Sequence, residues 1–526
     1  MKRFSCLLMF TLLISLVFVG NTSATTYYIA SNGADSNNGT SKTTPWAHAP
    51  GMTGCTATCA SATPLAGDQF ILRGGDTWTP SSLPWNWRWS GSSGNGILLG
   101  TDKTWYTGGA WSRPIFDGVG SYPGATPGGF FLQLVNSSYV TVDNFEFKGL
   151  NWSANLCSNE DAYIEKSGGT NVTIEHVYFH GWTHSAGICE GNDANAIYAG
   201  GSDTTSIVLQ IVVDGSDTAR DSFGGIYGGG IGEISQSYFS YLDNGLNGSC
   251  HLIHDSVFYD VGFLSYSGAV SHNNIAESNL DLPGGCIVYN NVMQGPFSTP
   301  GGVPVMQVPR SGDTSYAFNN LMMNSGAYGG TALWCGEFFS SGNSGGTCTW
   351  FNNTLEGGPD SNPTEPLFRI GAGLSGTVPA AINEFNNHGL TSGAMNAVSP
   401  ECSRACTVTQ ATSLLQTLST ANGQGYTLSK TFSFSPTSGG ATIGVGTNES
   451  SLCTTISGIN SVAGSACTQD TTYGVTYNSL SHTVSFPART PVSRPSTGAW
   501  DVGAYQFLSG SQSTVAPPTS LSATVQ

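Results

Sequence analysis

The chain has 526 residues, of which 70 are glycine and only 9% are charged, and its formal net charge is −17. This acidic balance argues against a nucleic-acid partner, because a phosphate-binding surface needs clustered Lys and Arg. The runs of Glu, Lys, Ala and Leu that build helical bundles are also missing. We therefore expect a long all-β protein with many turns.

The first 24 residues have the pattern of a secretory signal peptide. Lys2 and Arg3 precede an apolar stretch from Leu7 to Val19, and the small residues Thr22 to Ala24 suit a cleavage site. The apolar stretch is too short to span a bilayer, and no later segment is long and apolar enough to do so. We therefore expect a secreted, extracellular monomer with no membrane span.

The cysteines agree with an oxidising compartment. Apart from Cys6 in the signal peptide, 12 of the 13 cysteines remain, which is an even number. We expect disulfides rather than a metal site, because no two cysteines have the CxxC spacing of zinc sites. The pairs closest in sequence are Cys55/Cys59, Cys335/Cys348, Cys402/Cys406 and Cys453/Cys467.

The middle of the chain repeats a short strand pattern that contains Asn-Asn. The clearest copies are Ile287 to Met293, Tyr316 to Met322 and Thr349 to Leu355. Short alternating strands that recur at intervals of roughly 20 to 35 residues indicate a solenoid of β coils. Weaker copies place other polar residues at the position of the first Asn: Asn144, His176, Gln236, Asp255 and Asn386.

Equivalent residues of stacked parallel strands lie about 4.8 Å apart. We therefore predict that Asn290, Asn319 and Asn352 form one column, and that their amides hydrogen-bond to one another along the solenoid axis. This role is structural.

Both ends of the chain resemble a known group of proteins. The segment Thr26 to Thr40 is followed by Pro45-Trp46 and by Gly67 to Gly75, and the chain later closes with Asp501 to Tyr505. These segments resemble the secreted bacterial right-handed parallel β-helix proteins of the pectate-lyase-like superfamily. The resemblance implies a right-handed parallel β-helix with an N-terminal cap and an irregular C-terminal cap. It hands over no catalytic residues, because the Gly-His-Gly and Arg-x-Lys motifs of polygalacturonase-like members are absent.

The expected organisation follows from the repeats and from this resemblance. After the signal peptide (1–24), residues 25–130 form the N-terminal cap and first coils. Residues 131–395 form the clear coils, and residues 396–508 form the last coils and the C-terminal cap. Residues 509–526 are rich in Ser, Thr and Pro and indicate a flexible tail.

Three long insertions follow the repeated strand in successive copies, at residues 260–286, 295–315 and 323–347. Loops that leave equivalent corners of stacked coils line up along one side of a solenoid. We therefore predict an elongated groove suited to a polymer chain. The chemically capable residues of the insertions are His272, Glu277, Asp281, Arg310, Asp313, Trp334 and Glu337.

Each candidate has a chemical role that its side chain permits. Arg310 is a base or a partner for a sugar carboxylate, and His272 is a general acid or base. Glu277 and Asp313 form a carboxylate pair for glycoside hydrolysis. Asp281 with Asp313 holds Ca²⁺, the one cofactor that the sequence suggests, and Trp334 with Glu337 binds substrate. The alternative is that these residues are solvated loop charges.

A second group lies upstream and comprises Glu160, Asp161, His180, His184, Glu190 and Asp193. The i, i+4 spacing of His180 and His184 suits a metal on a helix, but the segment contains Gly and has no Glu between the two His. A metal is therefore not expected there.

Two functions fit these patterns. The first is a carbohydrate-active enzyme, a polysaccharide lyase or glycoside hydrolase that acts on an extracellular polysaccharide. The second is a non-catalytic extracellular or cell-surface protein in which the β-helix is a rigid rod that binds glycans. Fold resemblance does not decide between the two.

Overall fold

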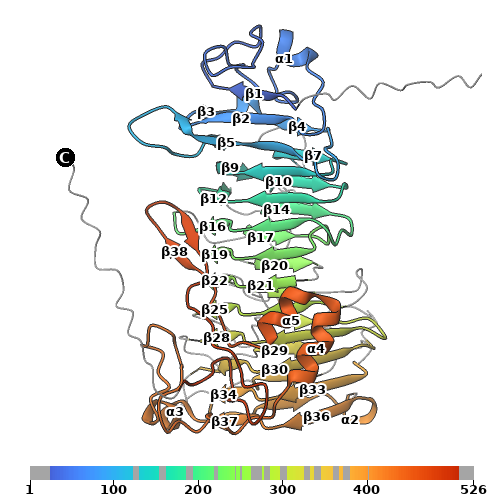
Figure 1. Cartoon of the computed structure of the whole chain (residues 1–526), viewed down its shortest axis with the longest axis vertical. Coiled ribbons are helices and arrows are strands. Elements are labelled where there is room, and N and C mark those ends of the chain that lie inside the picture. The colour runs from blue at the N-terminus through green and yellow to red at the C-terminus, as the bar shows by residue number, and fades with distance from the viewer. Residues whose placement is uncertain are drawn as a thin grey trace, which may run out of the picture.

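The computed structural model describes residues 24–121, 129–152, 162–184, 194–217, 223–242, 244–248, 252–261, 275–277, 285–295, 305–324, 332–336, 345–358, 366–370, 379–400 and 402–508. The strands stack along the long axis of the molecule, with the first coils at one end and the last coils at the other (Figure 1). Within the described residues they form three long parallel sheets, which we name A, B and C.

Sheet A has thirteen strands in the described residues. In sheet order they are β1 (Thr26–Ile29), β2 (Gln69–Gly74), β5 (Ile97–Tyr106), β8 (Val140–Asp143), β11 (Val172–Glu175), β15 (Ile207–Leu209), β18 (Glu233–Ser235), β21 (Leu252–His254), β24 (Ile287–Tyr289), β27 (Thr314–Phe318), β30 (Thr347–Phe351), β33 (Ala381–Phe385) and β36 (Thr407–Ala411).

Sheet B has eleven strands in the part of the chain that the structure describes. They are β4 (Trp85–Trp87), β7 (Phe130–Val135), β10 (Ala162–Ser167), β14 (Ala194–Gly200), β17 (Phe223–Tyr227), β20 (Asn244–Gly248), β23 (Ile275–Glu277), β26 (Val305–Gln307), β29 (Leu333–Cys335), β32 (Phe368–Ile370) and β35 (Asn396–Val398).

Sheet C has thirteen described strands, of which twelve complete the coils and the thirteenth, β13 (Thr183–His184), pairs with β9. The twelve are β3 (Thr77–Trp78), β6 (Ile115–Ser121), β9 (Glu146–Trp152), β12 (Tyr178–Phe179), β16 (Val212–Asp214), β19 (Tyr238–Ser240), β22 (Val257–Tyr259), β25 (Val292–Gln294), β28 (Leu321–Met323), β31 (Thr354–Glu356), β34 (His388–Leu390) and β37 (Leu414–Gln416).

Each complete coil runs from sheet B to sheet A to sheet C, and neighbouring strands in every sheet come from successive coils. The chain is therefore a right-handed parallel β-helix, and the fold expected from the sequence is confirmed. Short helices lie outside the coils: α1 (Ala57–Ser61), η1 (Pro80–Ser82), α2 (Cys402–Ala405), α3 (Leu418–Gly423), α4 (Ser450–Ile459) and α5 (Ser461–Cys467).

A single residue turns the corner between sheets A and C. Asn290, Asn319 and Asn352 occupy this position with φ of 56°, 56° and 53°. Asn tolerates this left-handed backbone better than most other non-glycine residues, which explains the repeated polar residue. The strands on both sides of the corner are in register, so the predicted column of these three residues is confirmed.

The continuous amide ladder belongs to the second Asn of each pair. Asn320 Oδ1 accepts bonds from the backbone N (3.1 Å) and Nδ2 (3.2 Å) of Asn291, and Asn353 Oδ1 accepts both bonds of Asn320 at 3.0 Å. These side chains lie inside the solenoid and are fully buried. The ladder predicted for the first Asn is wrong in this respect, because the Asn319 amide donates to the Gln469 carbonyl (2.9 Å) instead.

The interior is filled by apolar and aromatic side chains from all three sheets. Phe116, Phe147 and Phe179 stack from coil to coil at 5.0 and 5.5 Å, and Phe239 stacks on Phe258 at 4.9 Å. Strand alternation points every second residue inward, so a column of aromatics forms wherever successive copies place Phe at the same position.

The predicted insertions are not single loops. The segments 260–286, 295–315 and 323–347 contain the sheet B strands β23, β26 and β29, respectively. Each of these strands has three residues, so its alternation is too short to be read from the sequence. Each insertion therefore contains a strand of sheet B.

The C-terminal segment, residues 418–508, folds back along the outside of the coils. Helices α4 and α5 pack on the outward aromatic column formed by Tyr289, Phe318 and Phe351. Further along, the hairpin of β38 (Thr476–Asn478) and β39 (Thr483–Ser485) returns toward the first coils and lies beside sheet C (Figure 1). The segment's hydrogen bonds and ring contacts with the coils fall on sheets A and C and on the corner between them.

All four predicted sequence-close disulfides are confirmed: Cys55–Cys59, Cys335–Cys348, Cys402–Cys406 and Cys453–Cys467. Such bonds suit an oxidising compartment. The described residues contain no helix long and apolar enough to cross a membrane. Residues 1–23 and the tail 509–526 lie outside the described residues, so the signal peptide and the flexible tail stay predictions.

Candidate functional site

Three of the predicted site residues lie at or after the ends of two neighbouring strands of sheet B. Glu277 ends β23, and strand register places its backbone beside the end of β26 in the next coil. Arg310 and Asp313 lie in the turn that leaves β26, where the Asp313 backbone N donates to the Arg310 carbonyl (2.9 Å). Of Glu277 only the backbone is described, and His272, Asp281 and Glu337 lie outside the described residues.

Trp334 is on a strand rather than on the predicted wall loop. It sits in the middle of β29, is 3% exposed, and has the Arg369 guanidinium 5.3 Å from its ring centroid. Strand register makes Arg369 its direct partner on β32. A substrate-binding role for this ring stays a prediction.

Trp334 belongs to a column on the outer face of sheet B. Residues on both sides of the column, such as Ile164 and Leu333, lie in the core, so the column itself faces outward. Its described side chains are Gln133, Glu165, Tyr198, Tyr227, Trp334, Arg369 and Ala397, and between Tyr227 and Trp334 the backbone register continues through β20, β23 and β26.

The column presents aromatic and polar groups at successive coils. Tyr198 and Tyr227 stack with their ring centroids 5.8 Å apart, and Phe130 lies 6.3 Å from Tyr198. Gln133 donates its side-chain amide to Glu165. Flat aromatic rings with polar neighbours are suited to a ligand that has both apolar faces and hydroxyl groups.

The position of this column favours a functional role. At the Asn-Asn corners only two residues separate the strands of sheets A and C, and the C-terminal segment packs against both of those sheets. Sheet B instead carries Glu277 at the end of β23 and Trp334 on β29, and Arg310 and Asp313 follow its strand β26. The outer face of sheet B, with the residues that follow β26, is therefore the candidate functional site.

A second group of titratable side chains lies on the outer face of sheet C. His180 Nδ1 is 2.7 Å from Asp217 and its Nε2 is 3.2 Å from Glu146. Burial opposes the charge on His180, but these two hydrogen bonds outweigh burial and raise the pKa of the imidazole to about 9. His180 therefore carries a proton at neutral pH and bridges two carboxylates.

Of the other residues in the predicted upstream group, only His184 lies in the described part of the chain. His184 ends β13, which pairs with β9, and its side chain is not described. Glu160, Asp161, Glu190 and Asp193 lie outside the described residues. The carboxylates that do meet His180, Glu146 and Asp217, belong to neighbouring coils and could not be selected by spacing in the sequence.

One set of described side chains has the spacing of a metal site. A ligand atom from each of Asp143, Glu175 and His176 lies within 4.8 Å of the other two. His176 Nδ1 is 2.7 Å from Asp143, and this hydrogen bond raises the pKa of the imidazole despite partial burial. Both ring nitrogens of His176 already make hydrogen bonds, to Asp143 and to Gln210, so a metal would have to displace one of these bonds. This set differs from the predicted calcium ligands Asp281 and Asp313.

The chain also contains an Arg-x-Pro-x-x-Arg pattern, at Arg489 to Arg494. Here both arginines are structural. Arg489 pairs with Asp470 (2.6 Å), and Arg494 donates to Asn319 Oδ1 (2.9 Å) and to the Gly503 carbonyl (3.2 Å). They fasten the C-terminal segment to the coils.

The molecule thus belongs to the class of right-handed parallel β-helices, and comparison with known proteins gives the following likenesses. No protein-family model and no curated protein matches the chain. Among solved structures it is similar to pectate lyase Pel9A, with a TM-score of 0.41 and 15% identity over 93% of this chain and 97% of the other.

It is also similar to a rhamnogalacturonan lyase, with a TM-score of 0.41 and 13% identity over 74% of this chain and 87% of the other. A third likeness is the lacto-N-biosidase of Eubacterium ramulus, with a TM-score of 0.37 and 12% identity over 74% of this chain and 68% of the other. The fold assignment made above rests on the strand register of this chain.

Proposed function

We propose that this chain is a secreted β-helix protein that binds an extracellular polysaccharide along the outer face of sheet B. The observation that carries the proposal is the outward column on that face, in which Tyr198 stacks on Tyr227 at 5.8 Å. Equivalent residues of the column repeat at about the strand spacing of 4.8 Å. A polymer lying along the axis therefore meets a new side chain at each coil.

Secretion is supported by the four disulfides, which persist in an oxidising compartment. The acidic composition, with a formal net charge of −17, keeps the protein soluble and away from anionic surfaces.

Cleavage of the bound polymer at the corner between sheets B and A is the finer part of the proposal. If the substrate is a uronate, Arg310 neutralises the sugar carboxylate or accepts the C5 proton, and His272 is the alternative base. The C4–O bond then breaks, and the departing sugar oxygen takes the electron pair and a proton. Ca²⁺ held by Asp281 and Asp313 would bind the same carboxylate.

If the substrate is neutral, Glu277 and Asp313 act as the acid and base of a glycoside hydrolase, and their separation sets the stereochemical outcome. The placement of Glu277, Arg310 and Asp313 at or after the ends of two neighbouring strands supports both versions. The alternative is a rod that binds glycans without cleaving them.

The binding proposal is tested by affinity electrophoresis on a panel of polygalacturonate, alginate, xylan and galactan. Replacing Tyr198 and Tyr227 together with Ala should weaken binding of the preferred polymer at least about tenfold, the equivalent of 1.4 kcal/mol. Tyr106→Ala is the matched control, because Tyr106 is 39% exposed and lies on sheet A. Unchanged binding by the double variant would show that sheet B is not the binding face.

The cleavage proposal needs a separate measurement on the same panel. Ultraviolet absorbance of unsaturated products reports a lyase, and new reducing ends without that absorbance report a hydrolase. Arg310→Ala should abolish lyase activity and leave polymer binding measurable, whereas Arg404→Ala, an exposed arginine of α2, should change neither. Binding without any product on the whole panel would favour the non-catalytic rod.

A further inference from the structure

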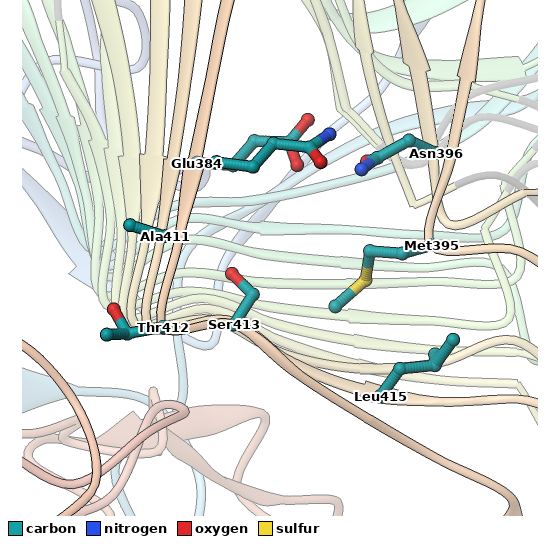
Figure 2. Close-up of a pocket in the computed structure, with 8 residues that line it drawn as sticks. Glu384, Met395, Asn396, Ala411, Thr412, Ser413 and Leu415 are labelled. Carbon is teal, nitrogen blue, oxygen red and sulfur yellow. The ribbon is translucent and has the colours of Figure 1, made fainter.

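The last coil of the β-helix carries an open cavity of about 230 Å³ (Figure 2). Strands β36, β35 and β37 are the last of sheets A, B and C, respectively, so the interior is not filled by a following coil at this end. The cavity is lined by Glu384, Met395, Asn396, Gln410, Ala411, Thr412, Ser413 and Leu415.

Glu384 points into this cavity from β33 (Figure 2). It occupies the inward position two residues after Ile382, where other strands place apolar core residues. Its side chain is 1% exposed, and its Oε1 atom has no hydrogen-bond partner among the described residues. Asn396 and Gln410 hydrogen-bond to the Glu384 carboxyl group, and the Oδ1 atom of Asn396 is also buried without a partner in that part of the chain.

Two unpaired acceptors at one cavity are costly. A buried polar atom without a partner costs about 1–3 kcal/mol, and an apolar side chain at position 384 would avoid the cost. The cavity is wide enough for roughly seven waters at about 30 Å³ each, or for one small molecule. Both acceptors require a hydrogen-bond donor from whatever occupies it.

The lining is electrically neutral at physiological pH. Burial raises the pKa of Glu384 to about 8, so the carboxyl group is mostly protonated at pH 7. The other seven lining residues carry no charged side chain. An ion in the cavity would therefore have no counter-charge. The amide, hydroxyl and carboxyl groups of the lining can instead donate hydrogen bonds to neutral hydroxyl groups and accept hydrogen bonds from them.

We propose that this end cavity is a second binding site, which takes one neutral polyhydroxylated molecule, a single sugar unit or a polyol. Hydroxyl groups of the ligand donate to Glu384 Oε1 and to Asn396 Oδ1, while Met395 and Leu415 contact its C–H surface. The site is separate from the outer face of sheet B, so it stands whether or not the proposed polysaccharide function is correct.

The test is isothermal titration of the full chain with glucose, galactose, xylose, rhamnose and glycerol as separate probes. At least one probe should saturate a single site, and Glu384→Leu should weaken that probe at least about tenfold. Glu449→Leu is the matched control, since Glu449 is also a buried acid with a raised pKa but lies at the start of α4, away from the cavity. It should bind as the native chain does.

A second variant keeps the test decisive if Glu384→Leu folds poorly. Leu415→Trp narrows the cavity from its rim, where Leu415 is 42% exposed and therefore tolerant of substitution. It should also abolish probe binding, while the double Ala variant of Tyr198 and Tyr227 should retain it. The proposal is overturned if no probe binds the native chain, or if a folded Leu415→Trp chain binds as well as the native one.

Discussion

The outward position that ends each strand of sheet A differs between the first and the later coils. Asp143 and Glu175 occupy it in the early coils, and Tyr289, Phe318 and Phe351 occupy it in the later ones. Helices α4 and α5 cover the aromatic part. The same repeat position is thus charged where water reaches it and aromatic where the C-terminal segment packs, so what covers a position decides its residue type.

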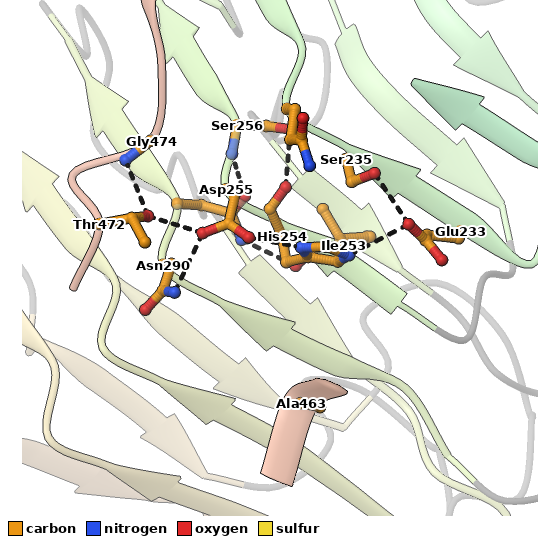
Figure 3. A network of polar contacts seen from close by, with 12 residues as sticks. Glu233, Ser235, Ile253, His254, Asp255, Ser256, Asn290, Ala463, Thr472 and Gly474 are labelled. Atoms are coloured by element: carbon orange, nitrogen blue, oxygen red, sulfur yellow. Dashed lines mark hydrogen bonds and ion pairs between the residues drawn. The ribbon is translucent and has the colours of Figure 1, made fainter. Parts of the chain in front are cut away.

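His254 stands at the boundary between these two parts (Figure 3). Its ring stacks on Tyr289 at 4.5 Å, while its nitrogens meet Asp255 (2.7 Å) and Glu233 (3.3 Å). Asp255 in turn accepts a hydrogen bond from Thr472 of the C-terminal segment (2.6 Å). A buried charge network therefore joins the polar early coils to the covered later coils.

The largest effect should come from the covered column. Phe318→Ala removes the middle ring of the stack, which lies 5.0 Å from Tyr289 and 5.1 Å from Phe351. Loss of a buried Phe costs about 3–5 kcal/mol of unfolding free energy. Glu175→Ala at the equivalent early position should cost less than about 0.5 kcal/mol. Urea denaturation measures both, and equal losses would break the comparison.

The next effect is a pH dependence at the boundary. Burial opposes the charge on His254, but its bonds to Asp255 and Glu233 raise the pKa to about 9 from 6.5. A raised folded-state pKa stabilises the fold fully below pH 6.5, and this stabilisation of about 3 kcal/mol is lost as pH rises through 9. His254→Gln should therefore remove the decline in unfolding free energy between pH 6.5 and 9. A variant with the native pH profile would contradict the assignment.

His388 is the matched control in a later coil. It is buried like His254, but its ring nitrogen hydrogen-bonds to the neutral Gln416 side chain (2.9 Å) rather than to a carboxylate, and burial lowers its pKa to about 4. The folded state therefore contains neutral His388, and the free energy of unfolding should decrease as pH drops from 6.5 toward 4. His388→Gln should change the acid limb of the profile and leave the alkaline limb alone.

The third effect separates the two Asn columns. Asn320→Ala leaves the Asn291 backbone N and the Val288 carbonyl without their buried partners, which should cost about 2–4 kcal/mol. Asn319→Ala instead removes bonds to Gln469 and Arg494. Hydrogen exchange should show opening of the coils in the first variant and of residues 461–503 in the second. If the same segment opened in both variants, the two Asn columns would not have separate structural roles.

The repeat and the corner were predictable because one residue type recurs where the backbone turns, as Asn319 and Asn352 do. The three-residue strand β26 was not predictable, because Val305 to Gln307 is too short to show a period. The fold-back of the C-terminal segment depends on contacts between residues such as Arg113 and His482, separated by 369 positions. No local pattern encodes such a pairing.

The candidate site was only partly predictable. Arg310 stands out because cations are scarce in the coils, and its grouping with Asp313 and Glu277 in one site stays a prediction. In the sequence, Glu384 is recognisable only as part of a weak copy of the repeat. Its position in the lining of the cavity depends on Asn396 and on the end of the solenoid. Burial and chain ends are properties of the folded molecule, so this site was missed.

The smallest effect concerns the cover over the early coils. The hairpin of β38 and β39 is held there by polar contacts, in contrast to the apolar seat of α4 and α5. Tyr477 Oη donates to Asp214 (2.8 Å), and the Arg113 guanidinium donates to the carbonyls of Ser481 (3.2 Å) and His482 (3.1 Å). Tyr477→Phe removes one of these bonds and should cost about 1 kcal/mol.

Because this cost falls on a segment with a small contact area, it should open the hairpin without unfolding the coils. Hydrogen exchange should therefore become about fivefold faster in residues 476–485 and stay unchanged around Phe318. Tyr106→Phe, in which the hydroxyl lies on another sheet, is the control and should leave hairpin exchange alone. If Tyr477→Phe instead accelerates exchange equally in the hairpin and under α4 and α5, the two covers form one cooperative unit. The contrast between a polar and an apolar cover would then have no energetic meaning.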